Sequence, residues 1–157
     1  MPESPDEEVE ALDLEWAPRL LRHLRLVLGR SLSSWAEDAL QETFLRVRKG
    51  GYEPDRGGLS TWLFTIAHRE ALRIRRREAL RAFLPLSSAS VPVAPAPADP
   101  RLEEALDTLQ PEVRAAILLV HLEDLTRKEA AEVLGVPERR VQDLCHRGFS
   151  ELRKRLK

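Results

Sequence analysis

The stretch from Leu125 to Arg147 constrains the fold of this chain most, because its pattern predicts two short helices joined by a tight turn. Thr126 and Glu129 have the spacing of a reciprocal capping box, in which each side chain accepts a hydrogen bond from the other residue's backbone N–H. Gly135 falls where the first helix must end in a left-handed conformation. Pro137 suits the first turn of the next helix, because its missing N–H would be unpaired there in any case.

Three positions inside this stretch have the spacing of a helix-turn-helix. Ala131 is small where the two helices would cross, Gly135 stands at the turn, and Val141 is an apolar residue that would seat the second helix. The alternative is an ordinary helical hairpin with no nucleic-acid role. Because the spacing and the capping residues agree independently, we favour a DNA-reading unit.

The composition indicates a helical chain. A length of 157 residues allows one domain or two small ones. The chain is 43% hydrophobic and 32% charged, and Leu, Ala, Arg and Glu dominate it, which favours helix. We therefore expect an all-α fold. The formal net charge of -1 gives no overall attraction to nucleic acid, so any DNA contact must come from local basic clusters.

The sequence offers no pattern of a catalytic or metal site, so we expect no enzyme activity and no cofactor. The single cysteine, Cys145, and four scattered histidines do not have zinc-ligand spacing. Cys145 shares an apolar helix side with Val141 and Leu152, which predicts a buried thiol in a reducing compartment; a redox sensor is the alternative. No run is long enough to cross a membrane, and the acidic N-terminus is unlike a signal peptide, so we expect a cytoplasmic protein.

The first thirty residues predict two core helices with a solvated acidic face. Ser4 and Pro5 have the character of a helix start, and apolar residues recur at helical spacing as far as Gly29. Pro18 is expected either to break this pattern or to open a second helix.

The segment SSWAEDALQETFLRVRKGG predicts an amphipathic helix, with Ser34 and Glu37 at capping-box spacing. One face is apolar, and the opposite face carries Asp38, Gln41, Glu42, Leu45 and Arg48. An exposed leucine beside carboxylates hints at a docking face. The alternative is a side that is simply solvated.

A second long helix is expected after Ser60, which is a plausible cap, and it holds the densest positive cluster of the chain. Arg69, Arg73, Arg76 and Arg77 fall near one face, with Arg75 and Arg81 close by. Arginine forks suit phosphate oxygens, and Trp62 at the head of the helix could stack on a base. An arginine-rich solvated helix, paired locally with Glu70 and Glu78, is the alternative.

Two segments of the first half resemble a known family. AEDALQETFLRV, followed by a Pro/Asp/Arg/Gly loop and STWLFTIAHREALRIRRR, is similar to the second conserved region of the extracytoplasmic-function (ECF) bacterial sigma factors. The helix-turn-helix resembles the fourth region of that family. The resemblance implies a transcription initiation factor with two small helical domains: a helical bundle at 1–83 and a helix-turn-helix domain at 101–157.

The resemblance also implies a role for each surface. The helix bearing Asp38, Gln41, Glu42 and Leu45 would dock on the clamp coiled coil of the RNA polymerase largest subunit. The region from Tyr52 to Arg77 would melt and read the minus-ten element, and the loop at 53–60 would capture a flipped base. The residues that we assign to the melted strand are Trp62, His68, Arg69, Arg73, Arg75, Arg76 and Arg77. The implied partners are core RNA polymerase, promoter DNA (duplex and melted non-template strand) and an anti-sigma protein, without membrane insertion.

The second helix of the helix-turn-helix would read the minus-35 element. Val141, Cys145, Leu152 and Leu156 would face inward. The residues left outward are Arg139, Arg140, Gln142, Asp143, His146 and Arg147. Arginine suits guanine or phosphate, and glutamine suits adenine. Gly148 inside this helix is expected to cost about 1 kcal/mol relative to alanine.

The chain departs from the family pattern at several reading positions. His68 and Arg69 stand where the family usually has Arg-Asn, and Arg73 replaces a family aspartate. Asp143 stands where a small residue is usual, and it would repel phosphate unless it accepts from a cytosine amine. These departures leave fewer groups that read base edges and more that bind phosphate, so we expect altered sequence preference.

Residues 84–100, LPLSSASVPVAPAPADP, carry one charge and no apolar periodicity, which predicts an extended linker between the domains. A linker of this kind permits both packed and splayed arrangements. Two other functions stay open. One is a stand-alone helix-turn-helix regulator that binds duplex DNA without polymerase. The other is a sigma-like decoy or adaptor that binds polymerase and starts no transcription.

Overall fold

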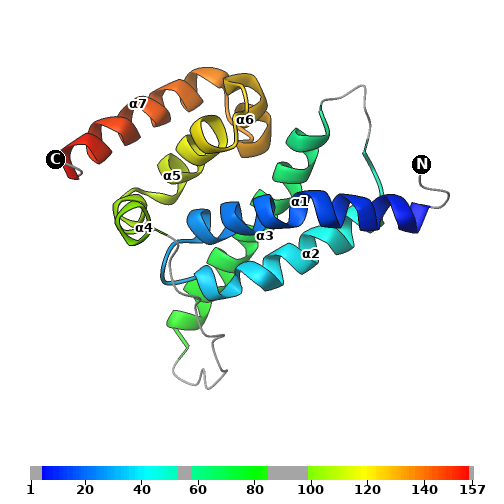
Figure 1. Cartoon of the computed structure of the whole chain (residues 1–157). Helices are drawn as coiled ribbons and strands as arrows, with labels where there is room; N and C mark the ends of the chain where they lie inside the picture. The colour runs from blue at the N-terminus through cyan, green and yellow to red at the C-terminus, as the bar shows by residue number, and fades with distance from the viewer. Residues whose placement is uncertain (1–4, 53–57, 85–98, 156–157) are drawn as a thin grey trace.

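The computed structural model describes residues 5–52, 58–84 and 99–155, and every regular element among them is helical (Figure 1). The expected all-α fold is confirmed. Some of the expected features lie outside the described residues: the cap at Ser4, most of the base-capture loop, the linker core at 85–98, and Leu156.

The helices fall into two groups along the chain. The first group is α1 (Pro5–Leu28), the short 3-10 helix η1 (Ser33–Trp35), α2 (Ala36–Arg48) and α3 (Leu59–Ala82). The second group is α4 (Pro100–Asp107), α5 (Pro111–Ile117), the π-helical turn η3 (Leu118–Leu122), α6 (Arg127–Leu134) and α7 (Glu138–Arg155).

The first group forms a three-helix bundle in which α1 and α2 run side by side and α3 crosses behind them (Figure 1). Apolar residues at helical spacing build its core: Leu20 and Leu24 from α1, Phe44 and Val47 from α2, and Leu63, Phe64 and Ala67 from α3. His23 is also fully buried there, with its ring 5.0 Å from the ring of Phe64 between centroids. Burial lowers the pKa of His23 to about 3, so this histidine is neutral in the folded protein.

The α1 helix is continuous through Pro18, so the expectation of a break or of a second helix there is wrong. Pro18 is exposed, while Leu20 and Leu24 are fully buried. A proline inside a helix costs about 3 kcal/mol because one backbone hydrogen bond is lost. Apolar packing on the opposite side of α1 offsets this cost.

The second group contains the predicted helix-turn-helix. The hydroxyl of Thr126 accepts from the backbone N–H of Glu129 at 3.0 Å, and the carboxylate of Glu129 accepts from the N–H of Thr126 at 3.0 Å. The predicted capping box is therefore confirmed. Gly135 has the left-handed conformation that the turn requires, with φ of 69°, and Val141, on the inner side of the second helix, is fully buried.

Gly148 lies where α7 crosses closely over α5. A Cβ atom at this position would lie 2.1 Å from Cδ1 of Ile117 and 2.8 Å from Cγ1 of Val113. The missing side chain thus lets the two helices approach, which gives the glycine a packing role that its helix propensity does not reveal.

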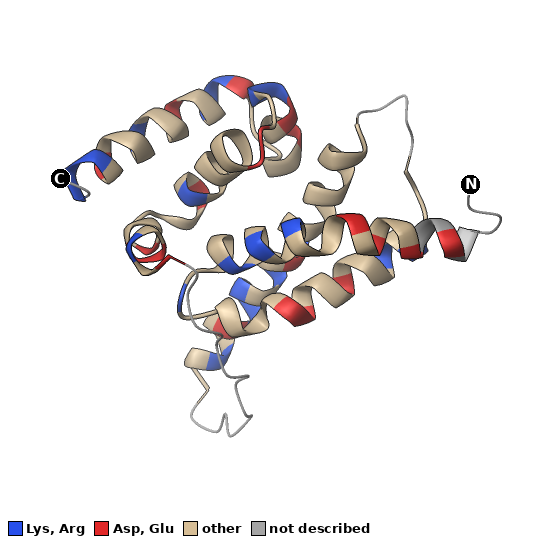
Figure 2. Cartoon of the chain, viewed as in Figure 1, with Lys and Arg blue, Asp and Glu red and all other residues tan. Residues whose placement is uncertain are grey.

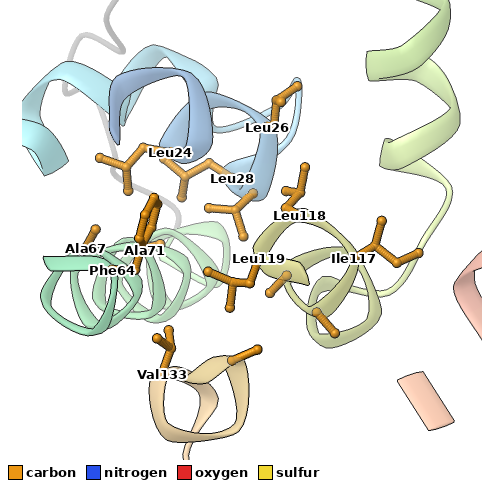
Figure 3. Close-up of a cluster of buried hydrophobic side chains, with 14 of the residues drawn as sticks. Leu24, Leu26, Leu28, Phe64, Ala67, Ala71, Ile117, Leu118, Leu119 and Val133 are labelled. Carbon is orange, nitrogen blue, oxygen red and sulfur yellow. The ribbon is translucent and has the colours of Figure 1, made fainter. Parts of the chain in front are cut away.

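The two groups of helices pack against one another. Figure 3 shows Leu28 of α1 beside Leu118 and Leu119 of η3, with Leu24 one turn away over α3 and Val133 of α6 beneath α3. All five of these side chains are buried. Of the packed and splayed arrangements, this structure has the packed one.

Candidate nucleic-acid interface

The buried side of α3 decides in which direction its arginines point. It begins at Leu59, and its N-cap is Gly58, so Ser60 is not the cap. Leu63, Phe64 and Ala67 bury one side of the helix in the bundle. The head of the helix carries Trp62, which is half-buried, with its ring 5.2 Å from that of Tyr52 between centroids.

Four of the seven residues assigned to the melted strand are exposed: Arg69, Arg73 and Arg76 point away from the bundle, while Arg77 packs on the Trp35 ring. Nη1 of Arg73 lies 3.8 Å from Oε2 of the buried Glu70 carboxylate, which is a long ion-pair distance. The three guanidinium groups recur along one side of α3, and they are available to phosphate oxygens.

The other cationic residues of α3 have partners within the protein. The guanidinium of Arg77 lies 4.4 Å from the centre of the Trp35 ring, and its Nε is 3.2 Å from the carboxylate of Glu78. Arg75 is half-buried and donates a hydrogen bond to the backbone carbonyl of Val27 at the end of α1. These two arginines therefore have a structural role in this arrangement of the helices.

His68 is also turned inward and is only 8% exposed. Burial and the charge of Arg75 lower the pKa of His68 to about 4, so its imidazole is neutral. His68 and Arg75 line a cleft of about 630 Å³, whose other wall is formed by α5 and α6 through Gln110, Pro111, Glu112 and Leu134. The cleft thus separates part of the expected strand-binding face from the helix-turn-helix.

The four residues assigned to polymerase docking share one exposed side of α2. Asp38, Gln41 and Glu42 are exposed, and Leu45 keeps 48% of its surface accessible. The opposite side of α2 packs on the bundle through Ala39, Phe44 and Val47. Figure 2 shows acidic residues along α1 and α2. The side of α2 expected to dock on polymerase therefore carries two exposed carboxylates, one amide and one exposed leucine.

The outward side of α7 carries the residues assigned to the minus-35 element. Arg139, Gln142, Asp143, His146 and Arg147 are all exposed, while Val141, Leu144, Cys145 and Leu152 pack inward. Arg140 differs from its neighbours, because it forms an ion pair with Glu112 of α5 at 3.1 Å. Burial raises the pKa of the Cys145 thiol, as expected for an inert packed cysteine.

The charged residues that join the two groups of helices were not expected from the sequence. Glu123 is fully buried at its side chain and binds Arg19 of α1, from Nε to Oε2, at 2.6 Å. Arg114 is 5% exposed, and its guanidinium donates to the carbonyls of Leu106, Leu109 and Val27. The one available signal was an arginine inside the apolar run PEVRAAILLV.

Neither a metal site nor a membrane span is found where the structure can be searched. In the described ranges, no group of three or more His, Cys, Asp or Glu residues could hold a metal ion. None of the described helices is long and apolar enough to cross a bilayer.

Comparison with known proteins identifies the two groups of helices. The family description Sigma-70 region 2 matches residues 12–81, and Sigma-70, region 4 matches residues 100–152. RNA polymerase sigma factor CarQ of Myxococcus xanthus is 35% identical over 159 residues, which covers 94% of this chain and 88% of that protein. The chain belongs to the ECF family of RNA polymerase sigma factors.

Further relatives agree with this assignment. ECF RNA polymerase sigma factor SigE of Mycolicibacterium smegmatis is 39% identical over 131 residues, covering 75% of this chain and 50% of that protein. The solved structure of the sigma factor RpoE in complex with the anti-sigma factor NepR from Bartonella quintana has a TM-score of 0.75 at 24% identity, covering 96% of this chain and 97% of that chain. CnrH in complex with the cytosolic domain of CnrY has a TM-score of 0.71 at 22% identity, covering 98% and 90%.

As an ECF sigma factor, the protein is an alternative sigma factor that binds core RNA polymerase and directs promoter-specific initiation. Members of this family are DNA-binding initiation factors that in general lack catalytic activity. The match of the N-terminal half to Sigma-70 region 2 argues against a stand-alone helix-turn-helix regulator.

Proposed function

We propose that this sigma factor has two domains and uses three separate exposed surfaces on them to bind polymerase, the melted strand and the minus-35 duplex. The domain at 1–83 would bind polymerase through α2 and the melted minus-ten strand through α3. The domain at 101–157 would bind the minus-35 duplex through α7, and residues 84–100 would link the two. The observation that carries this proposal is that the acidic side of α2 and the exposed arginines of α3 are both free of the bundle core.

The α2 surface suits a protein partner. Asp38, Gln41 and Glu42 surround Leu45, whose exposure of 48% is high for a leucine on a folded helix. An apolar contact ringed by charged groups is the usual composition of a protein interface. A basic partner surface would complement the carboxylates, and this complementarity would speed association.

The α3 surface suits a single strand. Arg69, Arg73 and Arg76 would bind successive phosphates, and Trp62 would stack on an unpaired base. Because cations outnumber base-edge readers here, the contacts would hold the strand more than they read its sequence.

The α7 surface suits the major groove of a duplex. Arg139 and Gln142 lie in the first turns of α7, and these turns enter the groove in helix-turn-helix proteins. Asp143 would disfavour phosphate and favour a cytosine amine. This combination of side chains would give the protein its own base-sequence preference at the minus-35 element.

We also propose that this sigma factor acts in the cytoplasm, where core polymerase and promoter DNA are found, and that a protein inhibitor controls it. Support for the inhibitor comes from the structural neighbours RpoE and CnrH, whose solved structures contain the anti-sigma factor NepR and the cytosolic domain of CnrY, respectively.

These three surface assignments are tested by transcription with core RNA polymerase from a genomic fragment library, with start sites mapped. Wild-type protein should create new start sites that share an upstream motif. Arg69→Ala with Arg73→Ala should bind core normally and lose open complexes. Asp38→Ala with Glu42→Ala should weaken core binding first.

Each result can contradict the proposal. Normal open complexes from the α3 variant would remove its strand-binding role, and unchanged core affinity of the α2 variant would remove the docking face. Glu132→Ala, on an exposed position of α6, is the control. Core binding by the wild type without any new start site would indicate a decoy or adaptor.

A further inference from the structure

A buried carboxylate lies among the exposed arginines of α3. Glu70 follows Arg69 in the sequence and comes three residues before Arg73, yet its side chain is only 5% exposed. It is turned toward α2, where Oε1 accepts a hydrogen bond from Nε of Arg46. A carboxylate is almost never buried unless it is paired, so Glu70 needs cationic partners.

The Glu70 carboxylate binds two arginines that come from two helices. Nη1 of Arg73 lies 3.8 Å from Oε2 of Glu70, which is the oxygen that Arg46 does not use. The side chain of Arg46 keeps 46% of its surface accessible, and that of Arg73 keeps 65%. Two positive charges therefore accompany one negative charge, which leaves the exposed side of this cluster positive.

Both arginines retain donors that Glu70 does not occupy. A guanidinium has five N–H donors, and the hydrogen bond from Arg46 to Glu70 uses Nε. Within the described ranges, no second carboxylate pairs with Arg46 or with Arg73. The unused N–H groups can donate to the oxygens of a phosphate, whose geometry an arginine fork matches.

This cluster adjoins the surface that we assign to the melted strand. Arg69 and Arg76 lie four residues before and three residues after Arg73, which places one exposed guanidinium about one helical turn to each side. Arg46 extends the basic surface from α3 onto α2, which packs beside it. A strand that follows α3 would therefore come within reach of Arg46 where it passes Arg73.

Glu70 holds Arg46 in place and keeps Arg73 beside it. By contrast, Arg69 and Arg76 form no ion pair with the residues that the structure describes. An arginine side chain loses rotamer freedom when it binds a ligand, and a guanidinium that is already held loses less. The two arginines on Glu70 are thus the preorganised part of the basic surface.

From this cluster we infer that Arg46 is a further strand-binding residue and that Glu70 is a positioning residue. Glu70 holds Arg46 and Arg73 as a two-arginine clamp for one backbone phosphate of the melted strand. Because the contact is to a phosphate, it does not depend on base sequence. This inference rests on the proposed strand-binding role of α3. The alternative is that Glu70 only fastens α2 to α3, in which case strand affinity is unchanged as long as the bundle is folded.

The direction of one effect separates positioning from charge. Glu70→Gln removes a negative charge beside the strand, so electrostatic attraction alone would tighten strand binding. Positioning by Glu70 predicts the opposite, a loss of about tenfold, which is the effect of one charge-assisted contact. Glu78→Gln is the matched control and should not weaken binding. Glu78 lies on the same helix and pairs with Arg77 and Arg81, at 3.2 and 3.1 Å.

The measurement is the fluorescence anisotropy of a labelled, mixed-sequence single strand of about 20 nucleotides, which exceeds the usual binding-site size. It is titrated in a salt series with core polymerase saturated with this protein, and binding by core alone is subtracted. Arg46→Ala should weaken binding by about tenfold. It should also lower the slope of log affinity against log salt by about 0.7, the value for one phosphate of a single strand.

Arg48→Ala is the matched control for Arg46→Ala. Arg48 is an exposed arginine of the same helix, and it pairs with Asp13 of α1 at 3.5 Å instead of with α3. Its removal takes one positive charge from α2 and should leave the salt slope of strand binding unchanged.

A triple variant shows whether Glu70 acts through the two arginines. When Arg46 and Arg73 are both alanine, Glu70→Gln should no longer weaken strand binding. A loss of the same size in both backgrounds would mean that Glu70 acts through the fold of the bundle, and it would overturn the positioning role. Circular dichroism and the affinity for core polymerase identify a variant that fails to fold. If Glu70→Gln fails to fold, Arg46→Ala decides whether the clamp exists.

The outcomes separate this inference from the proposed function. If Arg69→Ala with Arg73→Ala binds the strand as wild type does, the strand-binding role of α3 is wrong, and the clamp is overturned with it. If that variant weakens binding while Arg46→Ala changes neither the affinity nor the salt slope, only the clamp is overturned. Unchanged or tighter binding by folded Glu70→Gln overturns the positioning role.

Discussion

At the scale of single residues, two buried histidines make the stability of the protein depend on pH. His23 is fully buried with a pKa of about 3, and His68 is 8% exposed with a pKa of about 4. Each titrates near 6.5 in the unfolded chain, so below this pH the unfolded state binds more protons. The free energy of unfolding should be highest above pH 7. Below pH 6.5 it should fall by about 1.4 kcal/mol per pH unit for each histidine.

Urea unfolding at pH 7.5 and pH 5.0 measures this effect, with an expected loss of about 2 kcal/mol per histidine at pH 5.0. His23→Leu should remove its share of the loss, because neither ring nitrogen has a hydrogen-bond partner among the described residues. His146→Gln, at an exposed position, is the control. An equal pH dependence in His23→Leu and wild type would show that His23 is not buried as a neutral ring.

Gly148 gives a second prediction for a single residue. Gly148→Ala gains about 1 kcal/mol in helix propensity, but its Cβ would lie 2.1 Å from Cδ1 of Ile117. Overpacking of this kind costs about 1–3 kcal/mol, so thermal unfolding should show net destabilisation. Ile117→Val in the same chain removes the nearest atom and should recover part of the loss. A Gly148→Ala variant that is more stable than wild type would contradict this account of the α5–α7 contact.

At the scale of helices, sequence patterns correctly predicted the helix ends that depend only on neighbouring residues. The capping box of Thr126 and Glu129 and the left-handed Gly135 need only neighbouring residues, and the structure has both features. The start of α3 differs, because Gly58 takes the N-cap position expected for Ser60. Pro18 was misjudged because its local cost is offset by apolar contacts with helices distant in the sequence.

The recognition helix carries a prediction that separates two adjacent arginines. Arg139 is exposed, whereas Arg140 is held by Glu112 at 3.1 Å. Arg139→Ala should therefore weaken binding of the polymerase–sigma complex to its promoter by about 1–3 kcal/mol if Arg139 reads a base. If Arg139 binds a phosphate, the salt dependence should fall by about one unit of slope.

Arg140→Ala is the matched comparison, and it should change promoter affinity less than Arg139→Ala. The measurement is filter binding across a salt series, on a promoter identified by start-site mapping. A larger effect at Arg140 would mean that its contact with Glu112 is broken when DNA binds.

At the scale of the whole molecule, the sequence could not predict the contact between the two groups of helices. Arg19 and Glu123 are 104 positions apart, and no periodicity relates them. The acceptor that Arg75 and Arg114 share is a backbone carbonyl, which has no sequence signature. Arg75 was assigned to the melted strand from its place in a basic cluster, and its contact with Val27 follows only from how α3 packs on α1.

The shared core predicts that the two groups of helices unfold together. All three tryptophans, Trp16, Trp35 and Trp62, belong to the first group of helices, so tryptophan fluorescence reports on that group. Leu119, in η3 of the second group of helices, is fully buried where the two groups pack together. Leu119→Ala should lower the free energy of unfolding by about 2–5 kcal/mol, and tryptophan fluorescence should register that loss in full.

Fluorescence and far-ultraviolet circular dichroism, followed through one denaturant titration, decide the question. Both signals should shift together in Leu119→Ala, while Leu102→Ala, at a position 37% exposed, should leave both near wild type. A fluorescence transition that stays in place while part of the dichroism is lost earlier would mean that the domains fold independently. In that case the contact between the two groups of helices contributes little to the free energy of unfolding.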